Sequence, residues 1–441
     1  MIESNRIPNY ASEFTGDRRI RVVGSGFREH ALLELTKQSP QTAYVDISPG
    51  NAGTQEFNVP ISATNIRKQV EDAQARNIDL VIVGPEEPLA LGIRDQMNAV
   101  GIDVFGPTAE EARIESDKWF AIQLMREAGV VHPYTEAFYD EQTTLAYIKN
   151  RGVNTIVIKE NGLRAGKGVT VPDSLEEVSE ALTLAFGENY KQGQPLLVQD
   201  KVEGVEVSFI AVVDGEHIVP LLPSQDYKRV GDNDTGPNTG GMGAIAPSPT
   251  ITPDLQGRIM KEVMYPIVQT MRERGMNYQG ILYAGLMIEP SGNLNTIEFN
   301  CRGGDPEFPV ISTLLTPNFD IVELADSVRN GTLEPGQIRF LEKMSALGIV
   351  VASQGYPQEP ILGKVIEGLD QKLDDHSFLF QAGTKRAENK TVSSGGRIAL
   401  GIGRGRSFNE AKPLAKKVVD TIILEEKIQR QDIGDLFINN S

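Results

Sequence analysis

Short apolar runs that each end in a glycine turn are the feature that most limits how this chain can fold. One run covers residues 19–23 and leads into a Gly-Ser-Gly turn at 24–26, after which residues 29–35 have a helical pattern. Another run, residues 80–83, ends in a Gly-Pro turn. Apolar runs separated by helical segments predict a parallel sheet with ligand-binding loops at the strand ends. We therefore expect the chain to begin with an α/β domain.

Composition and charge restrict the possible partners. At 441 residues and 40% hydrophobic content, the chain has the length and composition of a globular protein with several domains. Its formal net charge of -17 disfavours nucleic acid, whose phosphates need a concentrated basic face. The single cysteine, Cys301, excludes a disulfide framework, and no apolar run is long enough to cross a membrane. We expect a cytoplasmic protein that binds neither nucleic acid nor membrane.

We divide the chain into three domains, which cover residues 17–117, 118–340 and 341–441. The first is expected to be a parallel α/β domain and the others to have α+β character. Within the second domain, residues 135–206 have the pattern of a small lid. Residues 280–288 and 294–299 should form a strand pair around a turn. The prediction is thus a multidomain α/β and α+β protein.

A helix is expected from about Ser407 in the C-terminal domain. Ser407 and Glu410 have the spacing of a capping box, in which each side chain would accept a hydrogen bond from the other residue's backbone. Pro413 lacks a backbone N–H and should kink or shorten the first turns.

An apolar run at residues 207–222 leads into charged residues at 226–229 and then into a glycine-rich segment, residues 231–243. Glycines leave backbone N–H groups free to approach an anionic ligand, because no side chain keeps the ligand away. We interpret this segment as a substrate loop. An ordinary surface loop is the alternative.

Lysines and glycines before and within residues 162–168 predict a phosphate site. The spacing is one residue shorter than in a P-loop, and Gly168 stands where the hydroxyl that holds magnesium should be. Gly166, Lys167 and Gly168 could still fold over a triphosphate, although a flexible hairpin tip would look similar. Lys159 ends an apolar strand just before this loop, where a lone ammonium is costly unless it meets an anion or solvent.

Glu298, Asn300 and Arg302 alternate along one expected strand, so their side chains should share a face. A carboxylate beside an amide oxygen suits magnesium bound to phosphates, and Arg302 could stabilise a transferring phosphoryl group. An ordinary half-exposed strand would show the same alternation. Cys301 should point to the opposite face as a core residue.

Two other site classes are not expected. The turn at 24–26 lacks the third glycine of a dinucleotide fingerprint, because Glu29 occupies that position. It predicts an anion site at a helix N-terminus rather than a nicotinamide site. The four histidines are far apart and lack zinc-ligand spacing.

Together these segments resemble the ATP-grasp ligases, and within them the phosphoribosylamine–glycine ligase family. The resemblance extends from about residue 19 to residue 423, and the segment 234–243 is its most specific part. The other motifs that carry it are at residues 23–26, 28–31, 49–53, 84–86, 88–89, 105–108, 165–168, 298–300, 304–307 and 382–384.

The resemblance implies an N-terminal α/β domain, an ATP-grasp core with a hinged lid, and a small C-terminal domain. It also implies a reaction in de novo purine biosynthesis. ATP would phosphorylate glycine to glycyl phosphate, and the amine of 5-phosphoribosylamine would displace phosphate to give glycinamide ribonucleotide, with ADP and phosphate as the other products. The implied cofactors are ATP and Mg²⁺ or Mn²⁺, and the implied state is a monomer or homodimer.

The resemblance also implies roles for individual residues. The residues expected to contact ATP are Lys118, Lys159, Gly166, Lys167, Gly168, Gln199, Val202 and Glu206. Glu298 and Asn300 would bind the metal. The residues expected to act in catalysis are Arg302, Lys228 and Asp226. The residues expected to contact the other substrates are Gly26, Arg28, Asn51, Glu86, Arg229, Asn238, Gly240, Gly241 and Asp305.

Several positions depart from the family pattern, among them Phe27, Gln199, Gly303 and Phe308. Phe27 replaces a glycine and Gly303 replaces a phenylalanine. Three of these changes are expected on the substrate side, so a related carboxylate–amine ligase with another acid or amine is an alternative. A nucleotide-binding protein without turnover is a second alternative, but a metal pair would then have no use.

Overall fold

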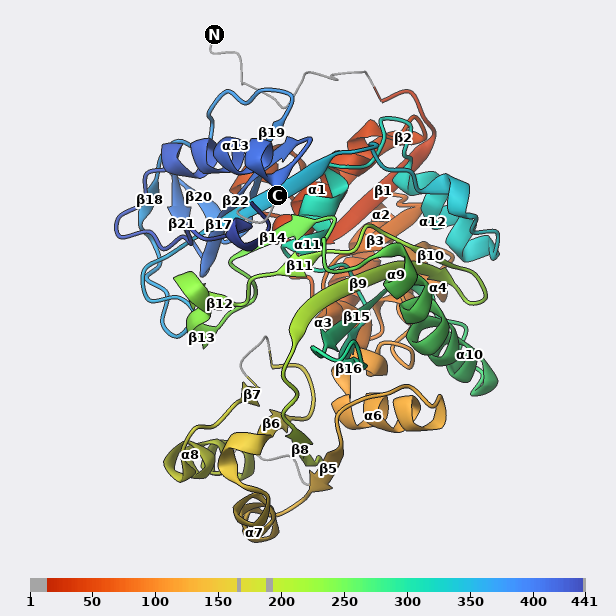
Figure 1. Ribbon diagram of the computed structural model, residues 1–441. Helices are drawn as coiled ribbons and strands as arrows, with labels where there is room; N and C mark the ends of the chain where they lie inside the picture. Colours follow the sequence, from red (N-terminus) through yellow and green to blue (C-terminus); the bar gives the residue numbers. More distant parts are fainter. Residues whose placement is uncertain (1–13, 165–167, 188–192, 439–441) are drawn as a thin grey trace.

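The computed structural model describes residues 14–164, 168–187 and 193–438 of the chain (Figure 1). The N-terminal part is a four-stranded parallel sheet with strand order β2-β1-β3-β4. Its strands are β1 (Arg18–Gly24), β2 (Thr42–Pro49), β3 (Leu80–Val83) and β4 (Asp103–Phe105). Its helices are α1 (Phe27–Gln38), α2 (Ile66–Ala75), α3 (Glu86–Ala90) and α4 (Ile93–Asn98). The predicted parallel α/β domain is confirmed.

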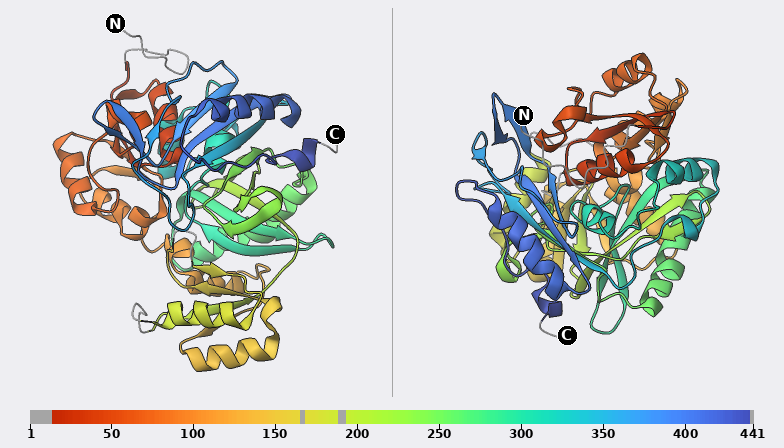
Figure 2. Two further views of the ribbon diagram at one scale, coloured as in Figure 1. Left: turned by 90° about the vertical axis from the view of Figure 1, so that its left-hand side faces the viewer. Right: turned by 90° about the horizontal axis from the view of Figure 1, so that it is seen from above.

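Residues between this domain and the central sheet form a separate small lobe, the lid (Figures 1 and 2). Two helices, α5 (Arg113–Ser116) and α6 (Lys118–Glu127), lead into it. Its sheet has the order β5-β8-β6-β7. The elements of the lid are β5 (Thr135–Phe138), α7 (Glu141–Arg151), β6 (Ile156–Glu160), β7 (Val169–Thr170), α8 (Leu175–Phe186) and β8 (Leu196–Asp200). The lid has a small hydrophobic core of its own, which includes Ile158, Val178 and Leu182.

The central sheet is antiparallel, with order β10-β9-β15-β16. Its strands are β9 (Val205–Asp214), β10 (Ile218–Pro220), β15 (Gln279–Ile288) and β16 (Leu294–Asn300). The predicted pair at 280–288 and 294–299 is confirmed. The helices of this part are α9 (Pro253–Ile259), α10 (Tyr265–Glu273), α11 (Glu307–Ser312) and α12 (Ile321–Asn330).

A third sheet joins the central part to the C-terminal part. Its order is β11-β14-β17-β22-β19, and it is joined where β14, which precedes α9, pairs with β17, which follows α12. The strands are β11 (Gln225–Asp226), β14 (Gly243–Ala246), β17 (Ser345–Ala352), β19 (Ser377–Gln381) and β22 (Arg397–Gly405). Between β11 and β14 lies a hairpin of β12 (Arg229–Gly231) and β13 (Thr235–Asn238). The small sheet beside it contains β18 (Val365–Ile366), β20 (Thr384–Ala387) and β21 (Lys390–Ser393).

The C-terminal helices are α13 (Phe408–Thr421) and α14 (Asp435–Ile438). Ser407 is the N-cap residue of α13, but its side chain accepts no capping hydrogen bond, and the predicted capping box is wrong. The carboxylate of Glu410 instead accepts a hydrogen bond from the backbone N–H of Arg406 at 2.8 Å. The helix continues through Pro413, so the predicted shortening is also wrong. No helix in the described part of the chain is both long and apolar enough to span a membrane.

Candidate active site

Two lysines from different elements lie next to the end of β16. Ile156 and Ile158 enter the lid core, so the alternation of β6 places Lys159 on the opposite face. Its Nζ donates to the carbonyl oxygen of Ile297 at 3.2 Å. Burial lowers the pKa of Lys159 to about 8, although the carboxylate of Glu298 opposes the shift. Lys118, the first residue of α6, donates to the carbonyl oxygen of Gly162 at 2.6 Å. This pair of ammonium groups suits a polyphosphate.

The remaining predicted nucleotide residues lie around the lid. Gly166 and Lys167 lie outside the described residues. The carbonyl oxygen of Gly168 accepts a hydrogen bond from the backbone N–H of Glu160 at 2.8 Å. Gln199 is buried in β8, where its Nε2 donates to the hydroxyl of Thr135 at 2.9 Å. The half-buried Val202 follows β8. Glu206 is the second residue of β9, the strand by which the chain passes from the lid into the central sheet.

The predicted metal pair, Glu298 and Asn300, is at the end of β16. Burial raises the pKa of Glu298, but the attraction of Lys228, Lys159 and Lys118 outweighs it and lowers the pKa below its ordinary value. The amide oxygen of Asn300 accepts a hydrogen bond from Arg302 at 3.2 Å. A carboxylate held ionised beside an amide oxygen fits a hard divalent cation.

Arg302 lies just beyond β16 and forms two ion pairs, at 2.9 Å with Glu86 and at 3.0 Å with Glu115. Sequence reasoning missed Glu115, which is on α5 and far from Arg302 along the chain. Burial raises the pKa of Glu115 to about 7, even though Arg302 favours its charged form. Its other oxygen accepts the backbone N–H of Cys301 at 2.8 Å. Cys301 itself is buried in the core, as predicted.

Asp226 and Lys228 are close together where β11 leads into the hairpin. Lys228 forms an ion pair with Glu206; burial lowers the pKa of Lys228, but Glu206 outweighs it and raises the pKa well above its ordinary value. Burial, with repulsion from Glu307, raises the pKa of Asp226 well above its ordinary value. The Oδ1 atom of Asp226 is buried and has no hydrogen-bond partner among the described residues. A carboxyl group and an ammonium group thus lie near enough for each to influence the pKa of the other.

Glu307 is a further charged residue that sequence reasoning assigned no role. It is the first residue of α11 and is 3% exposed. One carboxylate oxygen accepts hydrogen bonds from the hydroxyl of Tyr283 at 2.9 Å and from that of Ser208 at 3.2 Å. Both hydroxyls lie on strands of the central sheet. This buried network fixes the carboxylate that repels Asp226.

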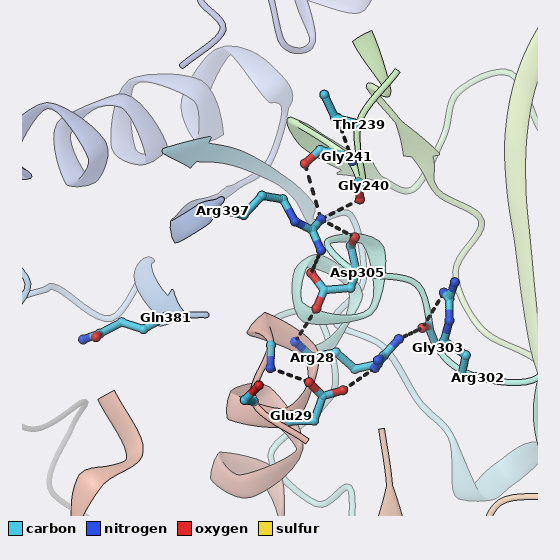
Figure 3. Close-up of polar contacts among 12 residues, drawn as sticks. Arg28, Glu29, Thr239, Gly240, Gly241, Arg302, Gly303, Asp305, Gln381 and Arg397 are labelled. Atoms are coloured by element: carbon cyan, nitrogen blue, oxygen red, sulfur yellow. Dashed lines mark hydrogen bonds and ion pairs between the residues drawn. The ribbon is translucent and has the colours of Figure 1, made fainter. Parts of the chain in front are cut away.

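The start of α1 meets the segment after β16 (Figure 3). The backbone N–H of Arg28 donates to Asp305 Oδ2 at 3.3 Å, and the Arg28 guanidinium donates to the carbonyl oxygen of Gly303 at 2.7 Å and pairs with Glu29 at 2.6 Å. A Cβ atom on Gly26 would lie 2.5 Å from Asp305 Oδ2, so a larger residue there would have to displace the Asp305 carboxylate. The predicted residues Gly26, Arg28 and Asp305 therefore lie together.

Gly240 and Gly241 lie on the other side of Asp305 (Figure 3). A Cβ atom on Gly241 would be 2.6 Å from Asp226 Oδ1, and the φ angle of Gly241 is +109°, a conformation that favours glycine. Arg397, on β22, donates to the carbonyl oxygens of this turn. Sequence reasoning missed Arg397 because it belongs to a different domain.

Asn51, Arg229 and Asn238 are the remaining predicted substrate residues. Arg229 and Asn238 face each other across the β12–β13 hairpin. The side-chain amide of Asn51 is engaged within the protein: its nitrogen donates to Ser25 at 3.0 Å and to Gln381 at 2.7 Å, and its oxygen accepts the N–H of Gly53 at 2.8 Å. A substrate role for Asn51, Arg229 and Asn238 stays a prediction.

The departures from the family pattern have a structural account. Phe27 and Phe308 are 0% and 5% exposed and belong to the same hydrophobic core cluster. A Cβ atom on Gly303 would lie 3.1 Å from Cβ of Phe308, so the Phe308 ring occupies the room that a side chain at 303 would need. Both rings pack in the core, and the Phe27 ring also lies 5.3 Å from the guanidinium of Arg397.

The fold and site together define an ATP-grasp enzyme: a lid, a central antiparallel sheet, paired lysines and a carboxylate–amide pair. Three family models match the chain. They are the N domain of phosphoribosylglycinamide synthetase at residues 18–115, its ATP-grasp domain at 116–308 and its C domain at 346–436. The chain belongs to the phosphoribosylglycinamide synthetase family, whose members are also called phosphoribosylamine–glycine ligases.

Relatives and solved structures agree with this assignment. The chain is 40% identical over 424 residues to phosphoribosylamine–glycine ligase of Pasteurella multocida, covering 94% of this chain and 97% of the relative. It is 41% identical to the Escherichia coli K12 ligase over 426 residues, covering 94% and 98%. The crystal structure of the Thermotoga maritima ligase matches with a TM-score of 0.79 and 32% identity, covering 94% of this chain and 100% of that one. A Campylobacter jejuni biotin carboxylase, at 14% identity, covers 96% of this chain and 97% of that one, with a TM-score of 0.70, and shares the fold.

Proposed function

We propose that this protein is the ATP-dependent ligase that joins glycine to 5-phosphoribosylamine through glycyl phosphate, giving glycinamide ribonucleotide, ADP and phosphate in de novo purine biosynthesis. The observation that carries the proposal is full-length similarity to ligases of this name, combined with a site that contains the expected charged residues. The departures that favoured another substrate are Phe27, Gly303 and Phe308. The two phenylalanines are core residues, and Gly303 packs against Phe308. They give no reason to prefer a different acid or amine.

Lys118 and Lys159 are proposed to hold the nucleotide phosphates, because both are partly removed from water and lie beside Glu298. Glu298 and Asn300 are proposed to hold Mg²⁺ or Mn²⁺, which when bound would neutralise phosphate charge. Arg302 is held between two carboxylates and would stabilise the negative charge of the acyl phosphate. No covalent nucleophile is required, so positioning and charge provide the catalysis.

Asp226 and Lys228 are proposed to face the acceptor amine. The unpartnered Oδ1 of Asp226 is a hydrogen-bond acceptor available for an amine, and the raised pKa of Asp226 brings its proton affinity closer to that of an amine. The enzyme is proposed to act as a monomer or a homodimer. We place the enzyme in the cytoplasm, in keeping with its single cysteine.

The test is ADP release by purified protein with ATP and Mg²⁺. Glycine and freshly generated 5-phosphoribosylamine are added separately and together. We expect turnover only with both, and glycinamide ribonucleotide should be detected by mass. ATP binding without that product would reject the proposed acceptor, and a screen of amines and amino acids would then identify the substrates.

A further inference from the structure

Both backbone groups of Gly240 are held by the C-terminal domain. Its N–H donates to the hydroxyl of Tyr356 at 3.0 Å, and its carbonyl oxygen accepts from Nη1 of Arg397 at 2.5 Å. Tyr356 follows β17, and Arg397 is the first residue of β22. Gly240 is therefore fixed through the peptide groups on both of its sides by two side chains of another domain.

Arg397 also joins this turn to Asp305 (Figure 3). The same Nη1 lies 3.4 Å from the carbonyl oxygen of Gly241 and 2.6 Å from that of Asp305, and Nη2 forms a 3.1 Å ion pair with the Asp305 carboxylate. The guanidinium lies 5.3 Å from the centre of the Phe27 ring. A planar guanidinium can stack on this ring and donate several hydrogen bonds at once, which a lysine ammonium cannot do.

The turn at residues 239–241 is in direct contact with Asp226 and Lys228. The hydroxyl of Thr239 accepts the N–H of Gly241 at 3.0 Å and donates to the carbonyl oxygen of Lys228 at 2.8 Å. The backbone N–H of Thr239 also donates to that carbonyl at 2.7 Å. Gly241 in turn approaches Asp226 so closely that a methyl group would collide with it. A shift of Gly240 would therefore displace Lys228 and Asp226.

We propose that Tyr356 and Arg397 are positioning residues, which fix the turn at 239–241 against Asp226 and Lys228 and so give the C-terminal domain control over the acceptor side of the site. The inference rests on the proposed function, since it assigns this side to the amine substrate. The paired lysines are held by other contacts: Lys118 donates to a carbonyl oxygen of the lid and Lys159 to one of β16. Nucleotide binding should therefore not depend on the two positioning residues.

Tyr356→Phe is a clean test because it removes only the hydroxyl. The ring of Tyr356 packs against Gly396, where a Cβ atom would lie 2.2 Å from ring carbon Cδ2, and phenylalanine keeps this packing. Arg397→Lys keeps the charge but removes the guanidinium fork. The matched control is Arg404→Lys. Arg404 is also on β22, donates to the carbonyl oxygen of Thr313 at 2.7 Å and lies over the Phe378 ring, away from the turn.

The experiment measures kcat, the KM for 5-phosphoribosylamine and for glycine, the Kd for ATP, and the melting temperature of each variant. We expect the KM for 5-phosphoribosylamine to rise roughly fivefold in Tyr356→Phe, as for loss of one hydrogen bond, and roughly tenfold or more in Arg397→Lys. The double variant should lose less than the product of the two effects, because both residues hold the same residue, Gly240. The Kd for ATP and the melting temperature should stay near those of the wild type, as should every parameter of Arg404→Lys.

An unchanged KM for 5-phosphoribosylamine in Tyr356→Phe would overturn the inference, as would fully multiplicative effects in the double variant. Weaker ATP binding together with a lower melting temperature would show a general structural role and would overturn it too. An active wild type with unaffected variants rejects this inference alone. A wild type that forms no glycinamide ribonucleotide rejects the proposed function and this inference with it.

Discussion

Glu298 is a carboxylate whose pKa several cations of the site lower. Lys118, Lys159 and Lys228 all attract it, and in the absence of the carboxylate these three cations would repel one another. Its role is therefore double, since it would bind the metal and also balance the lysines that hold phosphate.

We predict that Glu298→Gln lowers kcat at least about a hundredfold, as for loss of a major electrostatic contact at a reacting phosphate. The measurement is ADP release at saturating substrates, with circular dichroism to show that the fold is kept. Glu262→Gln is the control, because Glu262 is an exposed residue whose ion-pair partner, Arg258, lies four residues earlier in the chain. Turnover close to the wild-type rate in Glu298→Gln would remove the metal assignment.

Glu115→Gln should lower kcat with little change in the KM for ATP. One carboxylate oxygen forms an ion pair with Arg302, and the other accepts a hydrogen bond from the N–H of Cys301. An amide has only one oxygen, so one of the two donors would face an NH₂ group. We expect a loss of roughly tenfold or more, as for a broken buried ion pair. Steady-state kinetics decide the point, and Glu110→Gln, an exposed residue beside α5, is the matched control.

The sequence predicted the residues of the site that share one strand or one loop. Asn300 ends β16 and Arg302 follows two residues later, close enough to bond to it, and Asp226 and Lys228 are two residues apart where β11 leads into the hairpin. Glu115, Glu307 and Arg397 could not be predicted in this way. Their partners are in other elements, and only the tertiary fold brings them together.

At the scale of elements, the lid has its own hydrophobic core. Val178 and Leu182 on α8 are both fully buried against β6 and β8. The lid shares few apolar contacts with the central sheet, so its stability should be partly independent of the rest.

Leu182→Ala should destabilise the lid by about 2–5 kcal/mol, the usual loss when a buried leucine is shortened to alanine. Amide hydrogen exchange should rise in residues 135–200 and stay unchanged in the N-terminal sheet, and the KM for ATP should rise. Leu184→Ala is the control, because Leu184 is on the same helix but is 76% exposed. Uniformly faster exchange throughout the chain would show that the lid is not an independent unit.

Element prediction worked best where a strand is a continuous apolar run, as in β3, all four of whose residues are buried. It failed at the start of α13, because the spacing of Ser407 and Glu410 permits a capping box but cannot show that Glu410 bonds to Arg406 instead. The partner of β14 was also beyond sequence reasoning. β14 and β17 are about a hundred residues apart, and pairing over that distance leaves no local pattern.

At the scale of the molecule, His30 connects the first and last domains. It is 5% exposed on α1, and its Nδ1 accepts the backbone N–H of Gln381 on β19 at 3.0 Å. Burial lowers the pKa of His30 to about 4. The neutral ring is therefore needed both for burial and for this hydrogen bond.

The stability of the protein should fall in acid because of His30. In the unfolded chain His30 takes up a proton below about pH 6.5, whereas in the folded protein it resists protonation down to about pH 4. Its contribution is thus fully present above pH 6.5 and is lost as the pH falls toward 4, by about 2 kcal/mol between pH 8 and pH 5.

His30→Asn removes the titrating group and keeps an acceptor near Nδ1. Urea unfolding of both proteins at pH 8 and pH 5 should show that the stability advantage of the wild type shrinks by about 2 kcal/mol in acid. His376→Asn, in an exposed loop, is the control. A pH-independent difference between wild type and His30→Asn would contradict the assignment.

The sheet shared between β14 and β17 limits how this protein can be cut into pieces. A gene divided after residue 340 would encode two fragments, each with a freshly exposed sheet edge. Residues Ala346 to Ala352 of β17 are buried in the whole protein. In the C-terminal fragment expressed alone, β17 would be an unpaired edge strand and would promote aggregation. Expressed together, the fragments would recognise each other by strand pairing, so this boundary suits a split-protein reporter better than it suits an isolated domain.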